Sequence, residues 1–459
     1  MKKNIFLFFA LFITGVFASC KNDDDNNGIL INSDYELYGS VFNEVPDPED
    51  AVIYQVNLRA FTEQGTINAA AERLDHIKEL GANVVYLMPI YPVGIERSAG
   101  GLGSPYAVRN YKAVNDEFGT LEDLQAFVEK AHDLNLSVVL DWVANHTSWD
   151  NNWIIEHPEY YATDENGDMI APPDTGWNDV AQLDFENQDL QDAMIDAMSY
   201  WVYNANIDGF RCDAADFVPE GFWTRAVSTI DQIKDQEMLM LAEGGEQRHL
   251  RSGFDFIFGF NFFQTLEAVH NGESVTNIQT AQAQEYENVY DDGKRVVRYT
   301  TNHDVNLSDG TPLELFGGVD GSMAAFVVAA YMKSVPMIYN GQEIAYDQRL
   351  EFFTKTPIDW SQADEEVYQE YQQLIDFRKN SSAIEEGTYS GYSSDNVAAF
   401  TMKSEEETVL VLSNFRDQES AYIIPQQLAG EWQNALDEAS VNLESQINLA
   451  PYSYLVLRK

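Results

Sequence analysis

The sequence predicts an α/β protein built on a closed barrel of eight parallel strands, the (β/α)8 or TIM barrel. Short apolar runs alternate with longer segments whose apolar residues recur at helical spacing, from about residue 52 to residue 343. Strand–helix alternation implies a parallel sheet, and the eight apolar runs match the strand number of this barrel. A doubly wound open sheet is the alternative, but no glycine-rich phosphate-binding turn follows the first run.

The eight runs expected to form the barrel strands are rich in Val, Ile, Leu and Tyr. They cover residues 52–58, 84–90, 138–143, 209–214, 238–243, 254–258, 296–301 and 335–339. Amphipathic helices are expected at residues 67–80, 121–134, 190–204, 220–233 and 323–333, with a last one at residues 365–378.

A chain of 459 residues suits one large domain with an accessory domain. Residues 144–183, after the third strand, are too long for a simple loop, so they are expected to form a small inserted domain. Beyond Gly387 the pattern changes to short alternating runs, which indicate an antiparallel β domain. The predicted units are therefore a barrel at residues 49–385, interrupted by residues 144–183, and a C-terminal domain at residues 386–459.

The N-terminus carries Lys2 and Lys3, an apolar run at residues 5–17, and small residues before Cys20. This run is too short for a permanent membrane span, so residues 1–19 are expected to be a signal peptide. Residues 17–20 resemble a bacterial lipoprotein processing site, which implies a lipid on Cys20. The polar, acidic residues that follow predict a flexible tether over residues 20–48. They resemble the export signal of Bacteroidetes lipoproteins, which implies a lipid-anchored protein at the outer-membrane cell surface. The alternative is an ordinary secretory peptide with a free Cys20.

The net charge and the cysteine content limit which partners and which disulfides the protein can have. The formal net charge of −48 argues against a nucleic-acid partner, whose phosphates would be repelled. Cys20 and Cys212 are the two cysteines in the sequence. A lipid on Cys20 leaves no disulfide, and Cys212, between apolar neighbours, is expected to be a small buried hydrophobic residue.

Charged and polar residues of the kinds used in catalysis lie at the ends of four of the predicted strands or just after them. The third run continues as Asp-Trp-Val-Ala-Asn-His at residues 141–146, the fourth is Gly-Phe-Arg-Cys-Asp at 209–213, the fifth ends in Glu243, and the seventh leads to Thr-Asn-His-Asp at 301–304. Active sites of this barrel lie at the carboxyl ends of the strands, so these side chains are expected to converge.

Arg211 and Asp213 point to the same side of a strand, so Arg211 is expected to lower the pKa of Asp213 and keep it ionised. Two carboxyls in different surroundings, Asp213 and Glu243, make a nucleophile and an acid as in a retaining glycosidase. Taken singly, each residue has a structural alternative. Arg211 with Asp213 could be a buried ion pair, residues 302–304 a loop cap, and His146 a core histidine. Their joint placement at strand ends favours catalysis.

These four motifs, in this order and separation, resemble those of the α-amylase family, glycoside hydrolase family 13. Ser-Pro-Tyr at residues 104–106, Phe-Gly-Thr at 118–120 and Leu-Asp-Phe-Glu-Asn at 183–187 are similar to further family motifs. The resemblance covers nearly everything from about Asp50 onward. It implies a barrel with an inserted domain and a C-terminal β-sandwich.

The resemblance assigns roles to seven residues. Asp213 would be the nucleophile, Glu243 the general acid and base, and Asp304 the carboxyl that stabilises the transition state. The substrate-binding residues would be Tyr106, His146, Arg211 and His303. Many family members bind calcium near this site, and Asn145 and Asp184 match two ligand positions, so a structural Ca²⁺ ion is expected.

The chain departs from the family pattern at two places. Asp216 and Phe217 stand where many α-amylases have a Lys–His pair, and Gly244 and Gly245 follow the acid where relatives carry bulkier residues. Both changes bear on the side that holds the leaving-group sugar.

Together these observations predict a monomeric hydrolase of α-1,4-linked glucans such as starch or glycogen, acting within chains. The alternatives are a transglycosylase or isomerase on malto-oligosaccharides, and a non-catalytic glucan-binding surface protein. A binding protein needs no nucleophile, which disfavours the last. A pullulan or cyclodextrin hydrolase usually has an extra N-terminal domain, for which the residues between Cys20 and the first strand are too few. Aromatic residues of the insertion, among them Trp149, Trp153, Tyr160, Tyr161 and Trp177, either stack on sugars or pack the insertion onto the barrel.

Overall fold

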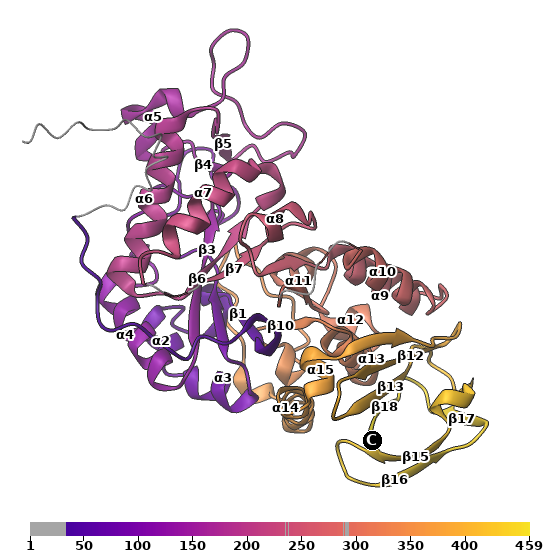
Figure 1. Cartoon of the computed structure of the whole chain (residues 1–459). Helices are drawn as coiled ribbons and strands as arrows, with labels where there is room; N and C mark the ends of the chain where they lie inside the picture. Colours follow the sequence, from indigo (N-terminus) through magenta and orange to yellow (C-terminus); the bar gives the residue numbers. More distant parts are fainter. Residues whose placement is uncertain (1–33, 235, 237, 288, 290–292) are drawn as a thin grey trace, which may run out of the picture.

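The computed structural model describes residues 34–234, 236, 238–287, 289 and 293–459. Its centre is a closed barrel of eight parallel strands (Figure 1). Each predicted run contributes one strand, so the predicted fold class is confirmed. Pairing of the first strand with the last closes the barrel. In barrel order the strands are β1 (Ile53–Val56), β2 (Val84–Leu87), β3 (Ser137–Val143), β6 (Gly209–Asp213), β7 (Leu239–Ala242), β8 (Phe256–Phe258), β9 (Arg295–Arg298) and β10 (Val335–Tyr339).

The barrel strands are buried on both faces. Every residue of β3 and β6 is buried, including the polar Asp141, Arg211 and Asp213. Helices cover the outside of such a barrel and packed side chains fill its interior, so its strands appear in the sequence as continuous apolar runs. The few charged residues within these runs therefore need partners, and they lie toward the carboxyl ends of their strands.

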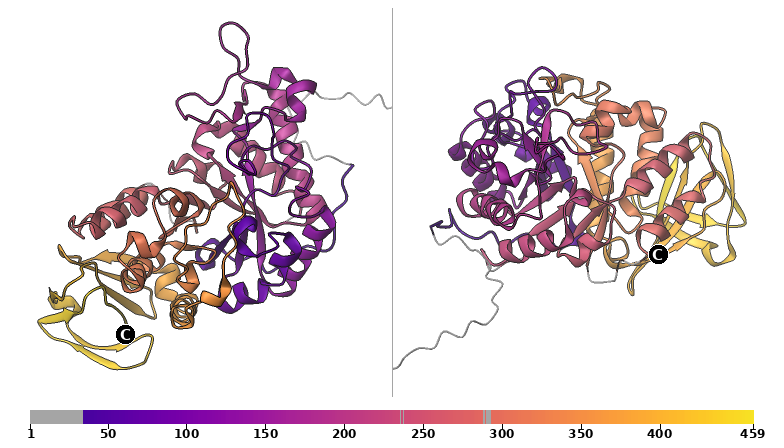
Figure 2. Two further views of the ribbon diagram at one scale, coloured as in Figure 1. Left: turned by 180° about the vertical axis from the view of Figure 1, so that it is seen from behind. Right: turned by 90° about the horizontal axis from the view of Figure 1, so that it is seen from above.

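Helices surround the barrel, as Figures 1 and 2 show. The predicted helix at residues 67–80 is split, because Arg73 N–H bonds back three residues to Ala70 O and ends the first helix. The guanidinium of Arg73 then lies 3.8 Å from the ring centre of Trp360. The helices that accompany the first half of the barrel are α1 (Leu58–Phe61), α2 (Ile67–Ala71), α3 (Leu74–Leu80), α4 (Leu121–Asp133), α6 (Gln188–Ala205) and α7 (Glu220–Ile230). Those of the second half are α8 (Arg248–Arg251), α9 (Phe260–His270), α10 (Asn277–Glu285), α11 (His303–Ser308), α12 (Pro312–Leu315), α13 (Val319–Tyr331), α14 (Glu365–Lys379) and α15 (Ser382–Glu386).

The segment after β3 forms an excursion above the barrel mouth (Figure 1). It begins with β4 (His146–Ser148), which pairs antiparallel with β5 (Val180–Gln182). Between these strands lie α5 (Asn152–Glu156), a 3-10 turn at Pro158–Tyr160, and extended loops. The two-stranded ladder returns the chain to its starting point, where Leu183 N–H donates to Asn145 O at 3.2 Å. This closure holds His146 at the barrel mouth.

The C-terminal part is a separate pair of antiparallel sheets, at the end of the molecule opposite the excursion (Figure 1). Leu410, Leu412, Trp432 and Leu457 belong to a hydrophobic core of its own. The domain packs against α13, where Ser413 Oγ donates to Ala324 O at 2.9 Å. The larger sheet contains β11 (Thr388–Gly391), β12 (Val397–Lys403), β13 (Thr408–Asn414), β18 (Tyr454–Arg458), β15 (Gly430–Asn434) and β16 (Ser440–Leu443), and the smaller one β14 (Ser420–Ile423) and β17 (Gln446–Leu449).

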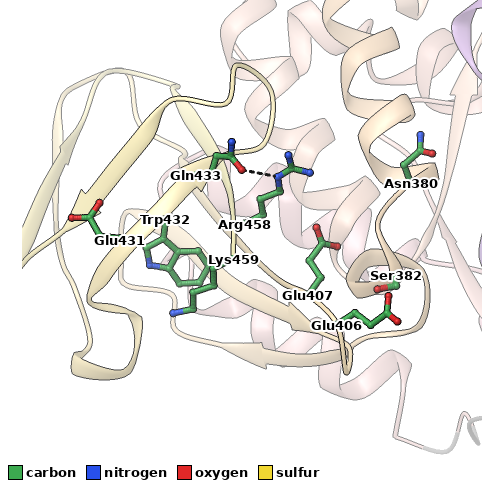
Figure 3. A pocket seen from close by; sticks show the side chains of 9 residues that line it. All are labelled: Asn380, Ser382, Glu406, Glu407, Glu431, Trp432, Gln433, Arg458 and Lys459. Atoms are coloured by element: carbon green, nitrogen blue, oxygen red, sulfur yellow. Dashed lines mark hydrogen bonds between the residues drawn. The ribbon is translucent and has the colours of Figure 1, made fainter.

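A cavity of about 580 Å³ lies where this domain meets the residues between α14 and α15 (Figure 3). Its polar lining includes Glu406, Glu407 and Glu431 as well as Arg458. The Trp432 ring at its edge is covered by Lys459, whose Nζ lies 3.8 Å from the ring centre. Trp432 is 3% exposed, so it offers no open face to a sugar. None of the residues that line this cavity belongs to the strand-end motifs.

The predicted signal peptide and the lipidated Cys20 lie outside the described residues. Within the part of the chain that the structure describes, no helix is both long and apolar enough to span a bilayer. Cys212 is fully buried and free, as predicted.

Candidate active site

The side chains predicted to act on a substrate meet at the carboxyl ends of the barrel strands. Six of them line a cavity of about 340 Å³ at the barrel mouth, together with Trp177 and Asp179 of the excursion. Arg211 lies beneath the cavity with a fully buried side chain. The structure thus brings together Tyr106, His146, Arg211, Asp213, Glu243, His303 and Asp304.

Arg211 joins the carboxyl groups into one cluster. Its Nη1 lies 2.7 Å from Asp141 Oδ1 and 3.0 Å from Asp213 Oδ1, and its Nη2 makes an ion pair with Glu243. Asp141 and Arg211 are direct partners in the β3–β6 register, which explains their contact. Asp141 is fully buried and was not among the predicted site residues, although it begins the motif at residues 141–146. Only the strand register shows that it shares the guanidinium.

The expectation of a lowered pKa for Asp213 is wrong. Burial, and then the neighbouring Glu243 carboxylate, raise the pKa of Asp213 well above its usual value, although Arg211 acts to lower it. A single guanidinium is divided among three carboxyls here, so its stabilisation of Asp213 is smaller than the desolvation penalty. Asp213 therefore loses its proton at a higher pH than an ordinary aspartate.

Glu243 follows the last residue of β7 and is held by the backbone after Asp213. Ala214 N–H donates to Glu243 Oε2 at 2.8 Å, and Ala215 N–H donates to the main-chain oxygen of Glu243 at 3.0 Å. Ala214 has a φ of 46°, a left-handed conformation that is uncommon for alanine. Such strain is typical of functional sites, and here it aims the N–H at the glutamate.

A chain of hydrogen bonds supports the opposite wall. Gln55 Nε2 donates to His303 Nδ1 at 2.8 Å, so His303 carries its proton on Nε2 and donates to Tyr106 Oη at 2.6 Å. Tyr106 in turn donates to Asp141 Oδ2 at 3.0 Å. Its ring stacks on that of His303, with centroids 5.4 Å apart. This chain links the predicted stacking tyrosine to the charge cluster.

Both predicted histidines are neutral at ordinary pH. Burial lowers the pKa of His146 and of His303 to about 4. Neutral imidazoles offer one hydrogen-bond donor and one acceptor, which suits sugar hydroxyls better than a fixed positive charge.

Asp304 occupies the first turn of α11. The Asn302 side chain caps this helix by accepting from the N–H groups of Asp304 and Val305, at 3.0 and 2.9 Å. The loop-cap alternative is thus correct for Asn302, while Asp304 itself faces the cavity. Its side chain is 56% exposed, against 11% for Asp213 and 16% for Glu243. Asp304 is the carboxyl most open to a ligand.

The two side chains expected to bind calcium make other contacts. Gln182 Nε2 donates to Oδ1 and to the main-chain oxygen of Asn145, both at 3.1 Å, and to Leu183 O at 2.9 Å. Asp184 accepts from Glu186 N–H at 3.0 Å. Calcium needs about six to eight oxygens directed at it. Here the NH₂ group of Gln182 already occupies the point toward which the two Asn145 oxygens and the Leu183 oxygen are directed. The donor set therefore does not fit the predicted ion, and no cluster of three or more His, Cys, Asp or Glu side chains suited to a metal occurs among the described residues.

Gln182 was missed because its contacts depend on the β4–β5 pairing, which places it opposite His146. The structure also separates the aromatic residues of the excursion into those that pack in the interior and one that is exposed. Trp149, Tyr160 and Tyr161 are buried and Trp153 packs against the core, so packing accounts for four of the five. Trp177 is 37% exposed and lines the cavity at the barrel mouth.

Comparison with known proteins places the chain among enzymes. The profile of the alpha amylase catalytic domain matches residues 16–173 and 174–431. Alpha-amylase 2 of Dictyoglomus thermophilum is 24% identical over 84% of this chain and 74% of its own length. An alpha-1,4-glucan:maltose-1-phosphate maltosyltransferase of Arcanobacterium haemolyticum is 27% identical over 69% of this chain and 45% of its own.

Among solved structures, an alpha-amylase from Lactobacillus plantarum superposes with a TM-score of 0.81, at 25% identity, over 90% of this chain and 99% of the other. The barrel, the strand-end carboxyls around one guanidinium and the match over nearly the whole chain agree. The chain belongs to the alpha-amylase family, glycoside hydrolase family 13, and is a glycoside hydrolase.

Proposed function

We propose that this enzyme hydrolyses α-1,4-glucosidic bonds in starch- or glycogen-type glucans, with retention of configuration and by attack within chains. The observation that carries the proposal is the guanidinium of Arg211, which contacts both Asp213 and Glu243 and so holds the two carboxyls close together. Retaining glycosidases keep this pair at roughly 5–5.5 Å, whereas inverting enzymes leave about 6.5–9.5 Å for a water molecule.

In the first step Asp213 attacks the anomeric carbon while Glu243 protonates the departing glycosidic oxygen. In the second step Glu243 takes a proton from water, which displaces Asp213 from the sugar. Arg211 stabilises Asp213 whenever that carboxyl is ionised, before attack and after release. The raised pKa of Asp213 means that the active form must first lose this proton.

We assign the orientation of the substrate to the side chains around Asp213 and Glu243. Asp304, the most exposed carboxyl, is placed to accept hydrogen bonds from sugar hydroxyls. Tyr106 offers a ring fixed by its bonds to His303 and Asp141. Hydroxyl contacts that strengthen as the ring flattens lower the barrier more than they tighten substrate binding.

Attack within chains is supported by the extent of the cleft. A second cavity, lined by Trp149, Met169 and Gly176 among others, shares Ala99 and Asp179 with the catalytic one. The binding surface thus continues over the excursion beyond the cleavage site, as a polymer substrate requires. We also propose a lipid anchor on Cys20 at the outer-membrane surface, from the N-terminal pattern, which mass spectrometry of the N-terminal peptide would test.

Transfer to a sugar acceptor is the second candidate, favoured by the similarity to a maltosyltransferase. It uses the same covalent intermediate and differs in what attacks it. A non-catalytic glucan-binding protein is disfavoured by the complete set of carboxyls around Arg211.

A product time course tests the proposal. The purified enzyme is incubated separately with amylose, pullulan and maltose, with Asp213→Asn as the control, and the first anomer released is identified by NMR. Rapid viscosity loss on amylose with α-anomeric oligosaccharides is expected. Intact amylose with longer sugars or isomers made from maltose would establish a transferase or isomerase. Binding without turnover of any substrate would establish a glucan-binding protein.

A further inference from the structure

The loop after β7 carries Glu243, and it is tied to the turn that follows β6. Ala214 N–H donates to Glu243 Oε2 at 2.8 Å, and Ala215 N–H donates to the main-chain oxygen of Glu243 at 3.0 Å. The position of the Glu243 carboxyl therefore depends on the conformation of this turn. Because the turn begins at Ala214, whose φ of 46° is uncommon for alanine, other contacts must hold it in place.

The side chain of Asp216, within this turn, bonds to two other segments. Its Oδ1 accepts from His249 Nε2 at 2.7 Å, and its Oδ2 accepts from Gly245 N–H at 3.2 Å. Burial acts to raise the pKa of Asp216, but its hydrogen bonds, first the one from His249, lower that pKa below its usual value. The carboxylate is thus ionised at ordinary pH and links the turn both to α8 and to the loop after Glu243.

Two neighbouring residues of α8 hold the turn. The side chain of His249 has no exposed surface, and among the described residues its Nδ1 has no hydrogen-bond partner. If Asp216 were removed, Nε2 would also be a buried polar atom without a partner, which costs free energy. Arg248 donates from Nη2 to the main-chain oxygen of Asp216. The turn is therefore bonded to α8 through both its backbone and its side chain.

The Asp216–His249 pair also packs against the backbone next to Glu243. A β carbon on Gly244 would lie 2.5 Å from Asp216 Oδ1 and 2.8 Å from His249 Nε2, closer than the 3.0 Å that real β carbons keep. Phe258 N–H donates to the main-chain oxygen of Gly244 at 3.0 Å. The two residues that follow Glu243 are therefore held by the pair and by the next strand of the barrel.

We propose that Asp216 and His249 are positioning residues for the Glu243 carboxyl. The pair fixes the turn at residues 214–217 to the loop at residues 243–245, and so keeps the N–H of Ala214 aimed at Glu243. A group that protonates a departing oxygen must be placed to within about 0.5 Å. In this role neither Asp216 nor His249 touches the sugar. The inference rests on the proposed function, because it concerns the acid step of that reaction.

The test uses two substrates that differ in how strongly they need a proton. Phenyl α-maltotrioside and 4-nitrophenyl α-maltotrioside have leaving groups of similar size, but phenolate is the more basic, so its departure depends more on a well-placed acid. For Asp216→Ala and His249→Ala, kcat/KM on the phenyl substrate is expected to fall about 10-fold, and on the 4-nitrophenyl substrate less than about 3-fold. Asp216→Asn keeps an acceptor for Gly245 N–H and an NH₂ group that His249 can accept from, so it should recover most of the rate on the phenyl substrate.

His132→Ala is the matched control. His132 Nε2 also lies 2.7 Å from a buried aspartate, Asp208, but that aspartate bonds to Val138 N–H near the amino ends of β3 and β6. This variant should lower the melting temperature without changing the ratio of the two rates. Equal losses on both substrates in Asp216→Ala, or no loss on either, would overturn the positioning role. A wild-type enzyme that cleaves neither substrate and leaves amylose intact would instead overturn the proposed function, and the inference with it.

Discussion

Replacing Arg211 by methionine should destabilise the enzyme and shift its pH dependence in the same experiment. The side chain has no exposed surface and contacts Asp141, Asp213 and Glu243. Removing one partner of a buried ion pair costs about 3–5 kcal/mol, because the remaining charges lose their counterion. In Arg211→Met these carboxyls escape part of that penalty by retaining protons, so the pKa of Asp213, already raised, rises further.

The sign of the pH effect follows from this shift. When the pKa of a carboxyl is higher in the folded state than in the unfolded state, the free energy of unfolding decreases as pH rises from the unfolded-state pKa to the folded-state pKa. The deficit in unfolding free energy of Arg211→Met should therefore be small below about pH 4, near the ordinary aspartate pKa, and should grow toward neutral pH. The acidic limb of kcat/KM should move to higher pH, since Asp213, as the proposed nucleophile, must be ionised to attack.

Urea unfolding followed by tryptophan fluorescence, at several pH values, measures the first effect, and initial rates on a soluble malto-oligosaccharide measure the second. Arg378→Met is the matched control. Arg378 is another fully buried arginine, but it contacts main-chain oxygens of Glu49 and Ser334 away from the site. It should destabilise the fold without moving the activity profile. A pH-independent stability deficit in Arg211→Met, or an acidic limb identical to that of the wild type, would refute the reasoning.

Three further changes test other parts of the site. Asp213→Asn should abolish hydrolysis while retaining glucan binding, and it should raise the melting temperature at pH 7–8 but not below about pH 4, since it removes a buried acid whose pKa is raised; normal turnover would exclude Asp213 as nucleophile. Chelation by EDTA should leave the wild-type melting temperature unchanged, because Gln182 already donates hydrogen bonds to both oxygens of Asn145. The Gln182→Asp variant should have a lower melting temperature unless calcium is added. A wild-type melting temperature that rises with calcium would support the predicted ion. Tyr106→Phe should lower kcat/KM about 10-fold by leaving His303 and Asp141 without their shared partner, and equal activity in both enzymes would show that the hydroxyl has no positioning role.

The sequence was sufficient for the barrel because its information is local. Each strand is an apolar run with a period that a short window reveals, and residues at the ends of parallel strands must share one edge. That is why Asp213, Glu243 and Asp304 could be expected to meet, although they are up to 91 residues apart in the chain. The break between α2 and α3 was missed because one back-bonded turn at Arg73 leaves the helical period almost intact.

What could not be predicted depends on pairs whose distance is set by register. The pKa of Asp213 needs a count of the charges around it, and that count includes Asp141, which reaches Arg211 only in the observed β3–β6 alignment. Gln182 meets Asn145 through the β4–β5 pairing in the same way. A local sequence pattern predicts the residue types at a site. The pKa values and hydrogen bonds of those residues depend on neighbours that are distant in the sequence.

The two departures from the family pattern illustrate this limit most clearly. Considered singly, Asp216 removes a positive charge near Asp213, and Gly244 removes a side chain beside Glu243. In the structure each requires the other, because Asp216 and His249 fill the space that a β carbon at residue 244 would need. A Gly244→Ala change should therefore push Asp216 away from the N–H of Gly245 and disturb the loop after Glu243. Restoring a smaller partner, as in Asp216→Gly with Gly244→Ala, should recover part of the lost activity, and the recovered fraction measures how far the two positions act as one unit.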